Sequence, residues 1–235
     1  MALPKLKNAP IYEMVTPSTG KKVRYRPFLM KEEKNLMIAM ESKDSKSVIH
    51  TLLDTIESCV DGEIVKSNLT TFDVEYMFLK IRSKSVGETT TIRVKCEECG
   101  EMNEIQVNID DIHIEVPKLD NVIQLSDDIS VELSWPSYID LADVDFTDEV
   151  STEQVFKIMQ KCFKAINTED ERILVKDTSP EELEEFIESM SSKQFDEIRK
   201  YIDSMPKLSH DIEFECKHCG HKNKVTVEGL TGFLS

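Results

Sequence analysis

The amino-acid sequence predicts an α+β fold in which two β-hairpins, remote from each other in the chain, face one another. Three observations support this class. Two Cys-x-x-Cys motifs lie 120 positions apart, at Cys96–Cys99 and Cys216–Cys219. Alternating apolar residues flank each motif, as is typical of the two strands of a hairpin. Apolar residues at helical spacing precede the first motif and fill much of the interval between the two.

The two motifs lie in matching frames. The stretches 92–107 and 212–227 align without a gap, and a glycine follows the second cysteine in both. Glycine accepts the left-handed backbone conformation that lets the chain turn back. The other recurring positions are Val94 with Phe214, Asn103 with Asn223, Ile105 with Val225, and Val107 with Val227.

The cysteine spacing predicts a metal site. A Cys-x-x-Cys turn places two thiolates close enough to share one ion. Structural zinc prefers four such ligands in a closed tetrahedron, so the two hairpins together supply a complete set. We therefore predict a zinc-ribbon-like pair of knuckles holding one structural zinc per chain through Cys96, Cys99, Cys216 and Cys219. No position remains open for water or substrate.

Other uses of these cysteines are weighed against zinc. Disulfides are disfavoured because the chain lacks a secretory signal, and thiols are expected to stay reduced in the cytosol. A thioredoxin-like redox pair opens a helix, which neither motif does. Iron in a rubredoxin-like site uses the same ligands and stays open. His218 and His221 are expected to be surface neighbours, and Cys59 and Cys162 core residues.

Composition narrows the function classes. The chain has 235 residues and a net charge of −16, although residues 1–50 alone carry +5. An acidic body disfavours general binding to nucleic-acid backbones. No run approaches the roughly 18 apolar residues that a membrane helix needs. A cytosolic globular protein is expected.

The N-terminal region, residues 1–90, is predicted to hold a β-hairpin over 10–28 and three helices. A helix over 29–42 turns Leu36, Met37 and Met40 to one side and Glu32 outward. Ser45 is expected to cap a second helix that runs to about residue 60. A third helix over 72–82 is apolar on most of its surface, which indicates burial or a partner.

The interval between the knuckles, residues 108–209, is predicted to be a mixed, mainly helical insertion. Alternation predicts strands at 112–116, 122–125 and 129–135. Capping boxes at Ser151 and Ser179 open two helices, the first of which extends to Ile166. A further helix ends before Pro206. The carboxylates follow a solvated helical surface, and none is paired for acid–base chemistry.

The predicted organisation has four parts. Residues 1–90 form the N-terminal region, 91–107 and 210–228 the two-part ribbon, 108–209 the insertion, and 229–235 an apolar tail. The tail either packs back on its own fold or docks into a neighbour.

Several motifs give the chain a family resemblance. It resembles the small baseplate proteins of T-even-type tailed bacteriophages, the group that contains a baseplate hub component and the hub assembly catalyst. The resemblance covers most of the chain and is weaker across about 108–180. The motifs that carry it are Leu3-Pro4-Lys5-Leu6, Pro17-Ser18-Thr19-Gly20, Tyr25-Arg26-Pro27-Phe28, Lys31-Glu32-Glu33-Lys34, Lys84-Ser85-Val86-Gly87-Glu88, both knuckles, Met205-Pro206-Lys207-Leu208 and the tail from Gly229 to Phe233.

The resemblance implies a structural or assembly role in the central baseplate of a contractile tail, without catalytic residues. The implied partners are other baseplate or hub proteins, with no membrane or nucleic acid and a homo-oligomer left open. The implied location is the host cytoplasm during assembly, and the virion tail baseplate if the protein is retained. The alternative is a zinc-ribbon nucleic-acid binder, which requires a basic face with aromatic stacking groups. An enzyme is the least favoured class, because no phosphate-binding loop, nucleophile elbow or zinc-protease motif occurs.

Overall fold

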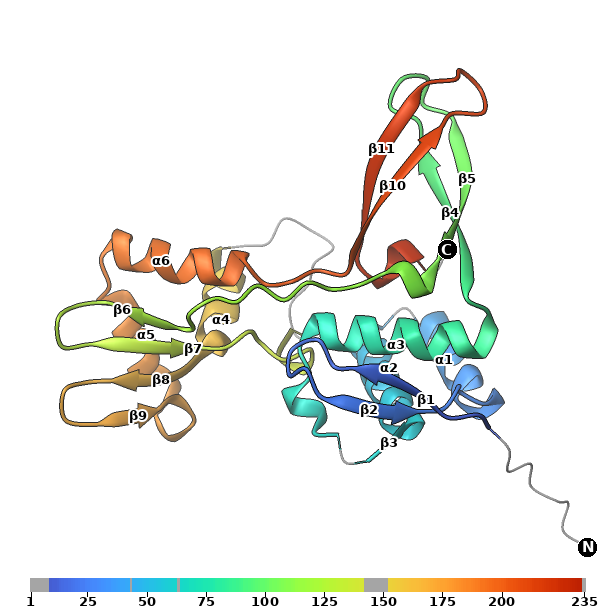
Figure 1. Ribbon diagram of the computed structural model, residues 1–235. Coiled ribbons are helices and arrows are strands. Elements are labelled where there is room, and N and C mark those ends of the chain that lie inside the picture. The colour runs from blue at the N-terminus through green and yellow to red at the C-terminus, as the bar shows by residue number, and fades with distance from the viewer. Residues whose placement is uncertain (1–8, 43, 63, 142–151, 234–235) are drawn as a thin grey trace, which may run out of the picture. The chain divides into compact units, whose positions relative to one another are not determined.

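A computed structural model of the chain describes residues 9–42, 44–62, 64–141 and 152–233 (Figure 1). Its helices and small antiparallel sheets confirm the α+β class. Contacts divide the chain into two compact units. Unit 1 comprises residues 1–115 and 207–235, and unit 2 comprises residues 116–206. The four-part division made from the sequence stays a prediction.

Unit 1 begins with the predicted hairpin. Strands β1 (Tyr12–Val15) and β2 (Lys22–Tyr25) pair antiparallel, and the two-residue strand β3 (Val60–Asp61) adds to the edge of β2. The helices of this unit are α1 (Met30–Ser42), α2 (Ser45–Cys59) and α3 (Thr71–Val86), and 3₁₀ turns η1 (Lys66–Asn68) and η2 (Ile109–Asp111) connect elements.

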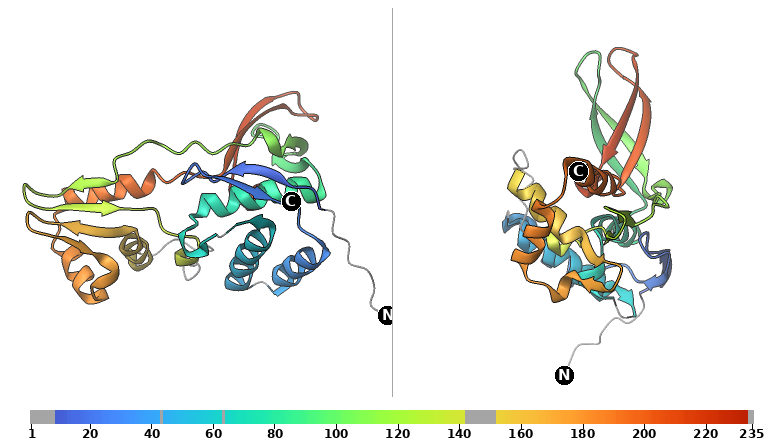
Figure 2. Two further views of the ribbon diagram at one scale, coloured as in Figure 1. Left: turned by 60° about the horizontal axis from the view of Figure 1, so that its bottom comes forward. Right: turned by 90° about the vertical axis from the view of Figure 1, so that its left-hand side faces the viewer.

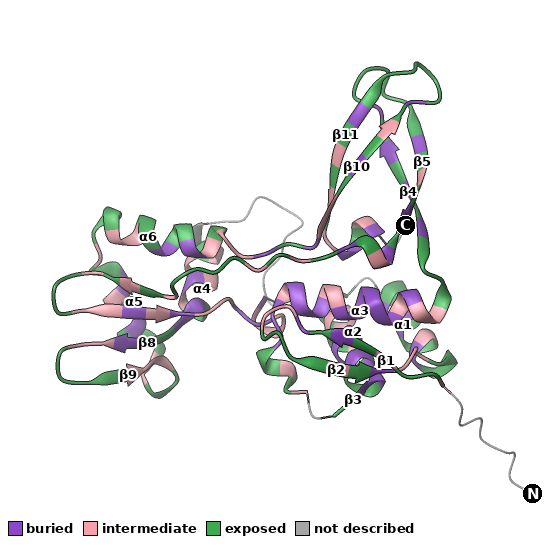
Figure 3. Cartoon of the chain, viewed as in Figure 1, coloured by how far each residue is buried: buried purple, intermediate pink, exposed green. Residues whose placement is uncertain are grey.

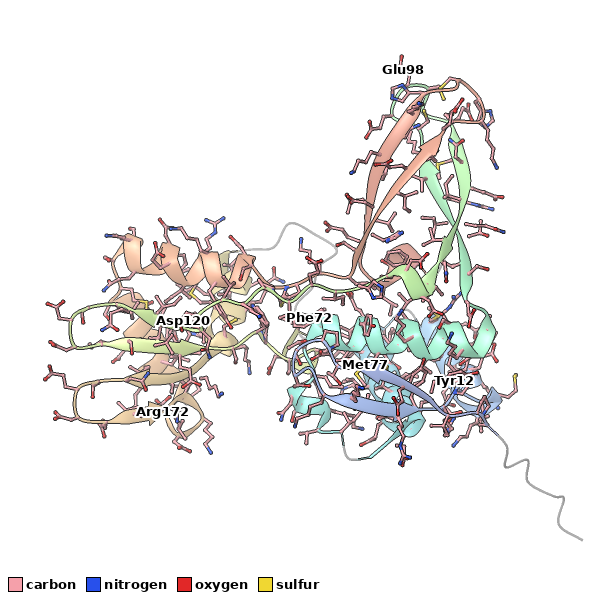
Figure 4. The ribbon with its side chains drawn as sticks, in the orientation of Figure 1. Tyr12, Phe72, Met77, Glu98, Asp120 and Arg172 are labelled. Carbon is pink, nitrogen blue, oxygen red and sulfur yellow. The ribbon has the colours of Figure 1, made fainter. Side chains whose placement is uncertain are left out.

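Helix α3 is the centre of the unit 1 core. Its Phe72, Met77 and Leu79 are fully buried, as expected for a helix that is apolar on most of its surface. Purple segments mark this burial in Figure 3, and Figure 4 labels Phe72 and Met77 on the helix. A capping box of Thr70 and Asp73 satisfies the first backbone N–H groups of α3.

Three details of the first helices differ from the sequence predictions. Glu32 is buried rather than outward, because its carboxylate accepts bonds from Arg26 Nη2 at 2.9 Å and from the Leu29 backbone N–H at 2.8 Å. Leu36 is buried, but Met37 and Met40, which were predicted on the same side of the helix, are more than half exposed. Asp44, not Ser45, caps α2, since its carboxylate accepts the N–H groups of residues 46 and 47.

The C-terminal tail packs on unit 1. Its 3₁₀ turn η5 (Leu230–Phe233) buries Leu230 and Phe233. The Thr90 hydroxyl donates to the Phe233 carbonyl at 3.1 Å, and the Leu230 N–H donates to Glu75 Oε1 at 3.4 Å. Of the two fates predicted for the tail, the described residues therefore adopt packing on the chain's own fold.

Unit 2 is a four-stranded antiparallel sheet with helices on one face. The strand order is β6-β7-β8-β9. Val131 and Leu133 of β7 point into a core shared with the three helices, while Glu132 on the other face pairs with Lys164 and Arg172. The elements are β6 (Val122–Gln124), β7 (Ser130–Leu133), α4 (Thr152–Cys162), β8 (Phe163–Asn167), β9 (Arg172–Leu174), α5 (Pro180–Glu188) and α6 (Ser192–Asp203), with 3₁₀ turns η3 (Ile139–Leu141) and η4 (Val175–Asp177).

The insertion differs from its prediction in two places. The strand predicted at 112–116 is wrong: the segment is irregular, and its Ile112 is a fully buried residue that directly follows the 3₁₀ turn η2. Ile166 does not extend helix α4, which ends at Cys162; it lies in β8, a strand that begins at the next residue. The Ser179 capping box is confirmed, whereas Ser151 lies outside the described residues. None of the described helices is both long and apolar enough to cross a bilayer.

Candidate metal centre

Two hairpins of equal length carry the cysteines. Strands β4 (Thr89–Lys95) and β5 (Met102–Asn108) pair over seven residues, and so do β10 (Ser209–Glu215) and β11 (Lys222–Glu228). Figure 1 and the right-hand view of Figure 2 show the two hairpins side by side. Each strand alternates apolar and polar residues, so each hairpin presents an apolar face.

The two turns have the same geometry. The Cys96 N–H donates to the Glu101 carbonyl at 2.9 Å, and the Cys216 N–H donates to the His221 carbonyl at 2.8 Å. Gly100 has φ of 75° and its counterpart in the second turn 74°. Residues with a Cβ rarely adopt this left-handed conformation, which explains the glycine in both copies.

The structure brings the four predicted cysteines together. Their Sγ atoms all lie within 4.8 Å of one another. Sγ of Cys96 is 3.7 Å from Sγ of Cys219, and Sγ of Cys99 is 3.7 Å from Sγ of Cys216. A disulfide bond measures about 2.05 Å, so these sulfurs are not bonded. The first cysteine of each turn is buried and the second is exposed.

The spacing of the sulfurs suits a tetrahedral ion. Zn–S bonds of about 2.3 Å place the sulfurs of a ZnS₄ tetrahedron about 3.8 Å apart. The two measured separations of 3.7 Å match this edge length. The donor set is four sulfurs with no carboxylate or imidazole among them, as zinc or iron prefers. The cluster is thus positioned to hold one metal ion.

Two buried asparagines connect the turns, because each accepts a hydrogen bond from the backbone of the opposite turn. Asn103 Oδ1 accepts the Lys217 N–H at 3.0 Å, and its Nδ2 lies 3.5 Å from Cys216 Sγ. In return, Asn223 Oδ1 accepts the Glu97 N–H at 2.9 Å. Each asparagine also donates to a carbonyl of its own turn, at 3.1 and 3.0 Å. The sequence repeat contains both asparagines, but only the structure reveals that they bond across the pair.

Hydrogen bonds set the acidity of the thiols. Burial disfavours the Cys216 thiolate, but the backbone N–H groups of Cys219 and His218 and the amide of Asn103 outweigh it and lower the pKa to about 6. The Glu101 N–H favours the Cys99 thiolate, yet burial and the neighbouring thiols raise its pKa to about 12. Ionising all four thiols at once requires a cation between them.

The remaining cysteines and the nearby histidines lie outside the cluster. Burial raises the pKa of Cys59 to about 11 and that of Cys162 to about 12, so both thiols are inert core groups as predicted. His218 and His221 are exposed at the knuckle surface. Glu98 marks the tip of the first knuckle in Figure 4.

Comparison with known protein families identifies the family of this chain. The model of the T4 bacteriophage base plate protein family matches residues 9–235. The chain belongs to the T4 bacteriophage base plate protein family. The resemblance found in the sequence motifs is thereby confirmed at the level of the family. No curated protein and no solved structure matches the chain.

Membership in the base plate protein family extends across both units. The matched residues include both hairpins of the cysteine cluster and all of unit 2. The four sulfurs thus lie within the part of the chain that the family shares, and the protein is a phage baseplate protein.

Proposed function

We propose that this baseplate protein is a structural or assembly component of the central hub of a contractile tail. It acts through contacts with other baseplate or hub proteins and carries no catalytic site. One structural zinc, held by Cys96, Cys99, Cys216 and Cys219, closes the ribbon and fixes the surface that partners recognise. The protein works in the host cytoplasm during assembly and in the virion baseplate afterwards.

The observation that carries this proposal is the convergence of four sulfurs from hairpins 120 positions apart, in a chain of the base plate family. A structural zinc contributes on the order of 10 kcal/mol to folding. Such an ion holds together the two ends of unit 1 that flank unit 2 in the chain. A rigid frame suits a protein that docks to several neighbours, because it loses less conformational entropy on binding.

Nucleic-acid binding is the competing function, and the charges disfavour it. The second knuckle exposes Lys217, Lys222 and Lys224, which is the feature that favours the alternative. The first knuckle carries four glutamates, and the whole chain has a net charge of −16. Backbone phosphates are repelled by such a surface.

Metal analysis tests the site. The purified wild-type protein is expected to contain one zinc per chain by mass spectrometry, and Cys96→Ser to lose it. Cys59→Ala is the matched control, because it also removes a buried thiol but leaves the cluster intact. A metal-free wild type, or one that holds iron, would overturn the zinc assignment.

Assembly is tested in infected cells. Wild-type and Cys59→Ala proteins are expected to co-purify with other baseplate subunits, and Cys96→Ser is not. If the metal-free variant associates fully with the other subunits, the metal-closed ribbon is not needed for assembly. Tight, salt-resistant binding to DNA or RNA in a titration would instead favour the alternative function.

A further inference from the structure

Unit 2 accounts for most of the net negative charge of the chain. Residues 116–206 contain 22 Asp and Glu against 9 Lys and Arg, a net charge of −13 out of −16. The first 50 residues carry +5. The two ends of this charge distribution attract each other in any contact that brings them together.

An apolar groove runs over the helical face of unit 2. It has a volume of about 860 Å³ and lies between α4, α5 and α6, the helices labelled in Figure 1. The rings of Phe156 and Phe195 lie 5.4 Å apart and are only half-buried. Val155 at the edge of the groove is 40 % exposed. Such a hollow suits apolar side chains of a docked segment.

The rim of this α4–α6 groove is acidic. Glu188 at the end of α5 and Asp196 and Asp203 on α6 are exposed at its edges. Among the described residues that line the groove, Arg199 is the one basic residue, and its Nε lies 3.6 Å from the Asp203 carboxylate. A segment with apolar anchors and positive charges therefore fits both the floor and the rim.

Residues 1–8 have that chemistry. Met1, Leu3 and Leu6 are apolar, Lys5 and Lys7 are basic, and the segment contains no acidic residue. Eight extended residues span about 27 Å, which exceeds the roughly 18 Å length of a twelve-residue helix such as α6. The proline at position 4 fixes one backbone dihedral and so reduces the entropy lost on docking.

We propose that the α4–α6 groove of one copy binds residues 1–8 of a second copy. Leu3 and Leu6 fill the hollow beside Phe156 and Phe195, while Lys5 and Lys7 pair with the acidic rim. The contact is head to tail, so the chain self-associates through two different surfaces. This association is separate from the metal site and does not depend on it.

The segment 142–151 is the competing occupant within the chain. It contains Asp143, Asp145, Asp148 and Glu149 and no basic residue. In the groove it would place like charges against the acidic rim, which costs affinity. Residues 1–8 have the opposite sign and are therefore the better match.

A peptide titration tests the groove. A fluorescent peptide of residues 1–10 is added to the protein that lacks residues 1–8, with the metal site intact. Binding is expected to be saturable and to weaken with salt. Asp196→Lys turns an attraction into a repulsion and is expected to weaken binding about tenfold. A peptide carrying Lys5→Glu is expected to bind Asp196→Lys better than wild-type protein.

The adjacent residue supplies a matched control. Glu197→Lys makes the same charge change on the same helix but does not line the groove. It is expected to change peptide affinity less than twofold. Equal weakening by both variants would overturn the groove as the site, and so would absence of peptide binding.

Self-association and cross-linking test the occupant. Sedimentation of the full chain is expected to show concentration-dependent dimers or larger species, which disappear on deletion of residues 1–8 or in Asp196→Lys. A photo-cross-linker in place of Ser192 is expected to link to residues 1–8 of another copy. A monomeric full chain, or cross-links confined to residues 142–151, would overturn the proposal even if zinc and baseplate association are retained.

Discussion

Removing one asparagine of the paired knuckles gives the sharpest test of how the ribbon is held. In Asn223→Ala the Glu97 N–H loses its acceptor at 2.9 Å, and the His221 carbonyl loses its donor at 3.0 Å. Asn223 is 4 % exposed, so water replaces these partners poorly. A buried polar group left without a partner costs about 1–3 kcal/mol. We expect a total loss of about 2–3 kcal/mol.

This loss should appear as weaker metal binding. Because 1.4 kcal/mol corresponds to a factor of ten, the zinc dissociation constant should rise about 30- to 150-fold. The stoichiometry should stay at one ion per chain, since all four sulfurs remain. The assay is competition with a chromophoric chelator at fixed pH, with equilibrium unfolding in urea measured on the same samples.

Asn108 provides the control for this substitution. It is an exposed asparagine at the other end of the first hairpin, where its side chain accepts the Asp110 N–H. Asn108→Ala should leave zinc affinity unchanged within about twofold and cost at most about 1 kcal/mol of stability. If Asn223→Ala competes with the chelator as well as wild type does, or if Asn108→Ala is equally impaired, the cross-bonding argument is refuted.

Three further substitutions probe other parts of unit 1. Burial disfavours ionised Glu32, but Arg26 and the Leu29 N–H outweigh it and lower the pKa of this carboxyl. The ionised group therefore stabilises the fold above its unfolded pKa, and this stabilisation is lost as the pH falls through the folded pKa. Glu32→Gln should flatten the acidic limb of a plot of urea midpoint against pH, and an unchanged limb contradicts this. Phe233→Ala leaves a cavity in place of a fully buried ring and should lower the unfolding free energy in urea by about 3–5 kcal/mol. A decrease below about 1 kcal/mol would mean that the tail is not part of the core. Gly220→Ala forces a Cβ into left-handed backbone and should cost about 1–2 kcal/mol by thermal unfolding. An alanine at the exposed strand position Thr91 should cost less than about 0.5 kcal/mol.

The cluster was predictable because its signal is local and repeated. Each Cys-x-x-Cys lies in a frame of alternating residues that specifies a strand, a turn and a strand. Zinc preference for four ligands then pairs the two frames without any knowledge of the chain between them. The bonds from Asn103 and Asn223 to the opposite turn were not predictable, because they depend on how the two hairpins face each other.

The wrong predictions concern segments whose local sequence pattern is compatible with two different structures. Ile158, Cys162 and Ile166 recur every four residues and imitate one long helix, but the chain passes from α4 into β8 without a glycine or proline to mark the change. Ile112 and its neighbours alternate like a strand, yet this segment joins none of the sheets among the described residues. Glu32 looks like a surface residue until Arg26, six positions earlier, is placed against it.

Because the two hairpins lie far apart in the sequence, the ribosome synthesises them at different times. The first two sulfurs emerge 120 residues before their partners, an interval of about 6–24 s at typical synthesis rates. During that interval Cys96 and Cys99 lack the two sulfurs with which they cluster, while all of unit 2 is being translated. Newly made chains therefore pass through a stage in which these two thiols are open to oxidants and to foreign metals, and the cluster is complete only after Cys219 has been added.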